Sequence, residues 1–223
     1  MVHVAERIPD GYEQISVAAH SLNEILLALT RLAEGIAGWM DAHGEPGGAA
    51  LRERGTQVVA GLRARIRRVE ELVAGRPRRR VVCLEWLDPF YCAGHWLPEM
   101  VERAGGWDPL GRPGRDSLRV DWSQVVAAQP EVLLALPCSL TLEQAAAELQ
   151  RLSDLPGTAS IPAVQAGQVW ALWAERYFSG SSPRVVDGIE VLAALLHPET
   201  AGRLLPAGAA REVDLGTAAP STS

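Results

Sequence analysis

Aromatic and imidazole side chains crowd one short stretch of the sequence, residues 86–96. The stretch contains Trp86, Phe90, Tyr91, His95 and Trp96. Such rings bind flat, partly apolar molecules by stacking, and a neutral imidazole also coordinates metal ions. Large apolar groups are mostly buried, so we expect two or three of these side chains to fill core instead. The stretch is the first candidate for a ligand site.

His95 has two interpretations. It could be an axial ligand to a bound metal centre, or a residue at a helix N-terminus that hydrogen-bonds to nearby backbone. No second ligand stands at metal-site spacing, which favours the structural role.

The residues offer no convincing catalytic constellation. The sequence contains no GxSxG, Walker A, GxGxxG or HExxH motif. Asp88, Cys92 and His95 lie too close in sequence for an oriented triad. Glu85 sits at a strand end, and Asp88 precedes a proline, where turn formation explains it. We therefore predict that the protein is not an enzyme.

Alternating strands and helices must position the ring-rich stretch. An apolar, β-branched run at 81–84 precedes it, and apolar residues at helical spacing follow at 97–104. Further strands are predicted at 132–136 and 169–173, with helices at 123–128, 141–152 and 183–196. Buried strands alternating with amphipathic helices predict an α/β fold with a largely parallel sheet covered on both faces.

Three loops follow the predicted strand ends, at 87–96, 137–140 and 174–181. In a parallel sheet such loops converge on one edge, which adds Tyr177 and Phe178 to the candidate site. Arg184, in the first turn of the last helix, is expected to pair with a carboxylate or a ligand edge. Asp187 and Glu190 are interpreted as solvated charges. An aromatic surface with few charges suits a large, flat, partly apolar ligand.

The ends of the chain differ from this alternating pattern. A short strand is predicted at 14–17, followed by a helix that Ser21 opens with Glu24 as its capping-box partner. A long amphipathic helix at 50–74 would form a rod of about 36 Å. Residues 201–223 are rich in Ala, Gly, Pro, Ser and Thr, and we predict a disordered tail there.

Composition excludes several classes of function. The chain has 223 residues, 48% hydrophobic and 22% charged, with a net charge of −6. This acidic balance argues against nucleic acid as a partner, and no apolar run is long enough to span a membrane. Cys83, Cys92 and Cys138 leave at least one free thiol and predict neither a disulfide framework nor a zinc site. The first residues lack a secretory leader pattern, so the chain as written is expected in the cytoplasm.

Several segments resemble one family in the right order. They read LEWLDPFYCAGHWLPEMVERAGG, RDSLRVDWSQVVAAQPEVLLALPC, IPAVQAGQVWAL and YFSGSSPRVVDGIEVLAALLHPE. Together they resemble the C-terminal lobe of the cobalamin-binding substrate-binding proteins of ABC transporters, in the vitamin B12 and ferric-siderophore class. The resemblance implies a Rossmann-like lobe of a class III, helical-backbone periplasmic binding protein. It implies a remnant of the N-terminal lobe at 1–48, a connector helix at 49–77 and a ligand-binding lobe at 78–200.

The implied function is binding of a corrinoid such as cobalamin for ABC-type uptake, with no built-in cofactor and an ABC permease as partner. By position, the ligand-facing residues would be Trp86, Phe90, Tyr91, His95, Trp96 and Phe178, and the loop and helix positions described above add Tyr177 and Arg184 as candidates. The missing lobe could come from a second copy, a separately encoded lobe or an upstream segment, and an incomplete N-terminus would imply a periplasmic location. Ser123, where the family tends to have a carboxylate, favours an alternative, a non-transport interaction or regulatory protein built on the same lobe.

Overall fold

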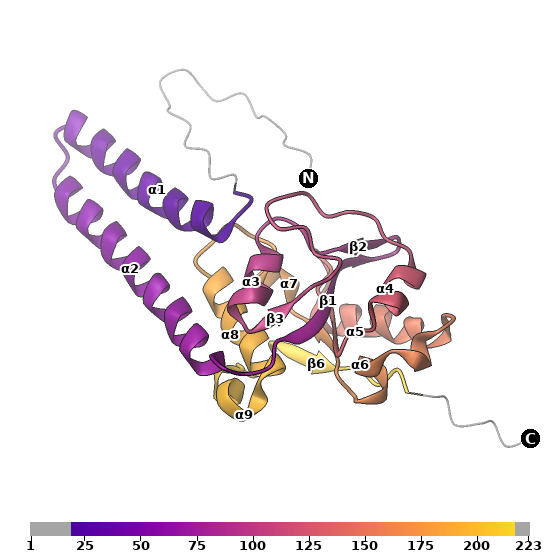
Figure 1. Cartoon of the computed structure of the whole chain (residues 1–223). Coiled ribbons are helices and arrows are strands. Elements are labelled where there is room, and N and C mark those ends of the chain that lie inside the picture. Colours follow the sequence, from indigo (N-terminus) through magenta and orange to yellow (C-terminus); the bar gives the residue numbers. More distant parts are fainter. Residues whose placement is uncertain (1–18, 217–223) are drawn as a thin grey trace, which may run out of the picture.

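A mixed sheet organises the chain, which the computed structural model describes over residues 19–216 (Figure 1). Its order is β2-β1-β4-β5-β6, with the short β3 pairing beside the start of β1. The central strands β1, β4 and β5 are parallel, whereas β2 and β6 pair antiparallel at the edges. The strands are β1 (Arg79–Leu87), β2 (Phe90–Cys92), β3 (Gly106–Trp107), β4 (Val132–Ala135), β5 (Val169–Leu172) and β6 (Ala210–Glu212). The α/β prediction is confirmed, and the strand predicted at 14–17 lies outside the described residues.

Helices cover both faces of this sheet because successive side chains of a strand point to opposite sides. Val81 and Cys83 enter the core formed with α2, α3 and α8. Val82 and Leu84 enter the opposite core, formed with α4, α5 and α6. The helices along this part of the chain are α3 (Leu97–Arg103), α4 (Trp122–Ala128), α5 (Leu142–Gln150), α6 (Pro162–Gln165), α7 (Ala174–Tyr177), α8 (Val185–Leu196) and α9 (Pro198–Ala201).

An antiparallel helical hairpin, α1 (Leu22–Ala42) and α2 (Gly48–Val73), extends away from the sheet (Figure 1). The helix α2 occupies the segment where the sequence predicts a long helix, and it packs against α8. Ser21 caps α1 as predicted, accepting a hydrogen bond from the Glu24 N–H at 3.2 Å. The Glu24 carboxylate, however, accepts from the His20 N–H at 2.6 Å, one residue before the cap.

Two predictions about the C-terminal region are wrong. Residues 201–216 are ordered: β6 pairs with the edge of β5, and Val213 and Leu215 are buried in the core. The apolar side chains around β6 and the unpaired edge of β5 outweigh the tail's disorder-prone composition. Residues 217–223 lie outside the described residues. Asp187 and Glu190 are also not simply solvated, because both accept hydrogen bonds from Arg65 of α2.

Two further properties of residues 19–216 bear on function. None of the described helices is long and apolar enough to cross a membrane. The three cysteines are free, and Cys83 and Cys92 are buried.

Candidate functional site

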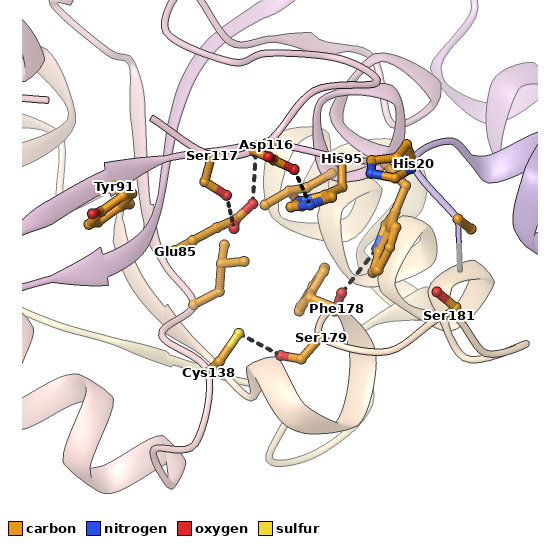
Figure 2. A pocket seen from close by; sticks show the side chains of 15 residues that line it. His20, Glu85, Tyr91, His95, Asp116, Ser117, Cys138, Phe178, Ser179 and Ser181 are labelled. Atoms are coloured by element: carbon orange, nitrogen blue, oxygen red, sulfur yellow. Dashed lines mark hydrogen bonds and ion pairs between the residues drawn. The ribbon is translucent and has the colours of Figure 1, made fainter. Parts of the chain in front are cut away.

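A cavity of about 550 Å³ opens where loops following β1, β4 and β5 meet. All three loops expected to converge contribute side chains to it. Figure 2 shows side chains from separate segments meeting in pairs: Glu85 with Ser117, His95 with Asp116, and Cys138 with Ser179. The lining consists of Ala19, His20, Glu85, Tyr91, Gly94, His95, Trp96, Leu97, Asp116, Ser117, Leu136, Cys138, Phe178, Ser179 and Ser181.

Four of the eight candidate ligand-binding residues line this cavity: Tyr91, His95, Trp96 and Phe178. Trp96 and Phe178 form one wall of the cavity. Both side chains are held in place because they are almost fully buried, at 8% and 4% exposed. The Trp96 indole N–H donates to the Phe178 carbonyl at 3.0 Å. This bond ties the start of α3 to the loop between α7 and α8.

The other four lie outside the lining. Trp86 is exposed on the β1–β2 hairpin, and its indole N–H donates to the Asp88 carbonyl at 2.9 Å. Phe90 packs on Trp122 at 5.4 Å between ring centroids, in the core on the other face of the sheet. Tyr177 is buried with its ring edge toward Trp173 and Phe178. Arg184 is exposed just before α8. Phe90 and Tyr91 are successive residues of β2, so their side chains point to opposite sides of the strand.

Glu85 holds the cavity's loops together, a role that the sequence did not reveal. One carboxylate oxygen accepts from the Gly94 N–H at 2.8 Å, and the other accepts from the Ser117 hydroxyl. The carboxylate therefore joins the ring-rich loop to the loop at 108–119. An acid at the end of an otherwise apolar strand is the available sequence signal for this role.

Asp108 anchors the second of these loops to β1. Its carboxylate accepts from the Cys83 N–H at 3.0 Å, and from the Leu110 and Gly111 N–H groups at 2.9 and 3.0 Å. Burial raises the pKa of Asp108 to about 6, and the nearby Glu85 charge acts in the same direction against the three N–H donors.

This raised pKa predicts a pH-dependent contribution to stability. A carboxyl whose pKa rises on folding contributes stability that is complete below the unfolded pKa and is lost as pH rises through the folded pKa, about 6 here. Relative to Asp108→Asn, the wild-type free energy of unfolding should therefore increase by about 1 kcal/mol between pH 7 and pH 5. Urea denaturation at several pH values measures this difference. Asp154→Asn, at an exposed carboxyl, is the control, and parallel pH profiles for wild type and Asp108→Asn would refute the assignment.

His95 lies where the two loops touch. Its backbone N–H donates to the Arg115 carbonyl at 2.6 Å, and its carbonyl accepts from the Gly114 N–H at 2.9 Å. Its φ is 52°, in the left-handed region that a non-glycine residue rarely adopts. The ring nitrogen Nε2 lies 3.2 Å from the Asp116 carboxylate. The ring therefore faces a carboxylate, which neither sequence interpretation anticipated.

His20 completes this corner of the cavity. Its ring stacks on the His95 ring at 5.5 Å between centroids (Figure 2). Sequence reasoning missed both His20 and Asp116, because His20 precedes the first predicted helix and Asp116 lies in a segment without predicted secondary structure. Periodicity gives no signal for such positions.

The charge of the lining limits the ligands that suit it. Glu85 and Asp116 contribute carboxylates, and no arginine among the described residues lines the cavity. Such an environment favours neutral or cationic ligands over anionic ones.

Comparison with known proteins identifies the fold and the family. The chain resembles an ABC transporter substrate-binding protein from Listeria monocytogenes EGD-e, with a TM-score of 0.66 and 13% identity over 83% of this chain and 67% of that one. It resembles the periplasmic vitamin B12 binding protein BtuF of Vibrio cholerae, with a TM-score of 0.62 and 23% identity over 83% of this chain and 65% of that one. It also resembles the apo form of the periplasmic heme-binding protein RhuT from Roseiflexus sp. RS-1, with a TM-score of 0.62 and 22% identity over 81% of this chain and 65% of that one.

The chain thus spans about two thirds of the length of these structures. No curated protein matches its sequence significantly. The family model for periplasmic binding proteins matches residues 31–175, and these proteins bind ligands for transport and are not enzymes. The chain therefore belongs to the periplasmic binding protein family.

Proposed function

We propose that this chain is the ligand-binding part of an extracytoplasmic substrate-binding protein, that its ligand is a corrinoid such as cobalamin, and that it delivers this ligand to an ABC permease. The observation that carries the proposal is the cavity wall formed by Tyr91, Trp96 and Phe178. Aromatic faces and edges at the end of a sheet suit a flat macrocycle, because stacking requires no charge on the ligand. The Vibrio cholerae protein of the same fold is a vitamin B12 binding protein.

Charge favours a corrinoid over heme. Heme carries two propionate groups that are anionic at neutral pH, whereas the amide groups around a corrin ring are neutral. The cavity has carboxylates from Glu85 and Asp116, and none of its described lining residues is an arginine. A heme propionate placed here would meet like charge without a guanidinium to pair with.

The cavity's size predicts modest affinity for this chain alone. A volume of about 550 Å³ is in the range that holds a drug-sized molecule, about 300–1,000 Å³. A complete cobalamin is larger, so part of it would remain in solvent. Tight binding would require further protein surface, consistent with a chain that spans about two thirds of its structural neighbours.

Titration with cobalamin and with cobinamide, monitored by corrin absorbance and tryptophan fluorescence, tests the ligand. Tyr91→Ala should weaken binding about fivefold, because it removes one stacking face worth roughly 1 kcal/mol. Trp86→Ala is the matched control, since Trp86 pairs across the same hairpin from Tyr91 but lies outside the lining.

Equal losses in the two variants would place the ligand over the hairpin instead of in the cavity. Absence of any spectral change at millimolar corrinoid would refute the proposed ligand. That result would favour the alternative function, a non-transport interaction or regulatory protein built on the same lobe.

The exposed face of α1 supports self-association, which would supply additional protein surface for the ligand. Leu32, Ile36 and Trp39 of α1 are exposed at 38%, 42% and 54%, and they recur at helical spacing. Contiguous exposed apolar side chains commonly mark protein interfaces.

We propose that a second copy of the chain covers the exposed side chains of α1. Light scattering should give a dimer mass that Ile36→Lys reduces to the monomer mass, with Arg68→Glu on α2 as a control. A monomeric wild-type protein at high concentration would exclude this arrangement.

A further inference from the structure

Three side chains at the edge of the cavity form a cluster of metal-ligating groups. They are His20, His95 and Asp116, and their ligand atoms all lie within 4.8 Å of one another. In Figure 2 the two imidazoles and the carboxylate approach one another from separate segments. We propose that this cluster binds a divalent first-row transition-metal ion such as Zn²⁺.

The distances suit a tetrahedral ion after small side-chain rotations. Ligands at about 2.0–2.1 Å from Zn²⁺ lie about 3.3 Å from one another in a tetrahedron. His95 Nε2 and Asp116 Oδ1 are 3.2 Å apart, which already matches one edge of such a site. The remaining separations, at most 4.8 Å, must shorten by about 1.5 Å, a movement that exposed side chains can make.

Two backbone hydrogen bonds hold the segment at the start of α1 that carries His20. The His20 N–H donates to the Glu24 carboxylate at 2.6 Å, so the first turn of α1 fixes the residue before the cap. The Leu22 N–H donates to the Glu99 carboxylate at 3.0 Å, which joins the start of α1 to α3. Because His95 lies two residues before α3, this contact keeps the two imidazoles together.

His95 and Asp116 are held by paired loops. The His95 N–H donates to the Arg115 carbonyl, directly before Asp116. Gly94 lies against the same loop so closely that an added Cβ would lie 2.8 Å from the Arg115 carbonyl oxygen. The Asp116 carboxylate is 85% exposed, and its contact is with His95 Nε2 at 3.2 Å. A metal ion would therefore displace no buried hydrogen bond of this side chain.

The chemistry of the three ligands selects the class of ion. Two imidazoles and one carboxylate suit Zn²⁺, Ni²⁺ or Cu²⁺, whereas Ca²⁺ and Mg²⁺ require mainly oxygen ligands. Three protein ligands also leave at least one coordination position, which here faces the cavity. Water or a donor atom of a solute would fill that position.

This site is independent of the proposed corrinoid. Corrin nitrogens occupy four positions around cobalt, so the protein can supply only one axial ligand on a given face. A cluster that offers three ligands requires an ion with at least three free positions. The two proposals can therefore fail separately.

Zn²⁺ titration of the full chain, prepared without a polyhistidine tag and without corrinoid, tests the site. A chromophoric chelator competes for Zn²⁺, and visible absorption of the Co²⁺ complex reports tetrahedral nitrogen and oxygen coordination. One Zn²⁺ per chain should bind, and His20→Ala, His95→Ala and Asp116→Ala should each weaken binding more than tenfold. Loss of an outer partner of a metal site already costs about 10–100-fold.

His43→Ala is the matched control, because His43 is an exposed histidine at the opposite end of α1. It should leave Zn²⁺ affinity unchanged. Circular dichroism of each variant separates loss of a ligand from loss of the fold. The proposal is overturned if the wild type binds no saturating equivalent of Zn²⁺, or if folded His95→Ala and Asp116→Ala bind it as tightly as the wild type.

Discussion

Replacing Trp96 with alanine is expected to lower the free energy of unfolding by about 3–5 kcal/mol, as for other large-to-small core substitutions. The Trp96 indole is buried against the core that contains α3 and α8, and its N–H satisfies the Phe178 carbonyl. The variant would leave a cavity and an unpaired carbonyl together. Since about 1 kcal/mol shifts the melting temperature of a chain of this size by roughly 2–4 °C, the melting temperature should fall by about 6–20 °C.

Trp96→Phe separates the two contributions. It keeps most of the ring volume but removes the donor, so we expect a loss of about 1–2 kcal/mol. Chemical denaturation of the three proteins measures the series. If Trp96→Ala is no less stable than Trp96→Phe, the indole does not form the wall described here. The same series should reduce corrinoid affinity, because Trp96 and Phe178 line the cavity together.

Replacing Gly94 with alanine is expected to disrupt the cavity itself. A Cβ at this position would collide with the Ser117 nitrogen and lie 2.8 Å from both the Arg115 carbonyl oxygen and the Asp116 carbonyl carbon. These are backbone atoms, so the two loops must separate. The free energy of unfolding should fall by about 1–3 kcal/mol, which is the usual cost of overpacking.

Ligand binding should also fall in this variant. The Glu85 carboxylate bridges the Gly94 N–H and the Ser117 hydroxyl. His95 contacts Asp116 between the same two loops. Binding constellations tolerate displacements of only about 0.5 Å. Zn²⁺ and corrinoid affinities should both drop at least tenfold.

Gly180→Ala provides the control for this substitution. An added Cβ at Gly180 would have no atom within 4 Å, although the residue lies in the loop that carries Ser179 and Ser181 into the lining. Both stability and binding should stay near wild type there. Wild-type affinities for Zn²⁺ and corrinoid in a folded Gly94→Ala protein would show that the contact between the two loops does not position the site.

The sequence identified three of the loops that line the cavity but not all of its lining residues. Tyr91, His95, Trp96 and Phe178, which were predicted because rings cluster where apolar strands end, line the cavity. Trp86 and Phe90 carry the same signal, yet they point elsewhere. Residue type and position relative to a strand do not show which way a side chain leaves an irregular loop.

The sequence by itself determined the sheet of buried strands, the helices on both of its faces and the edge at which the loops gather. Those features follow from local periodicity, because apolar spacing of two or about 3.6 residues fixes which face of an element is buried. Only the tertiary structure decided that His20, Glu85 and Asp116 meet His95, and that β6 completes the sheet edge. These contacts join segments far apart in the chain, and hydrogen bonds between loops specify them without a repeating pattern.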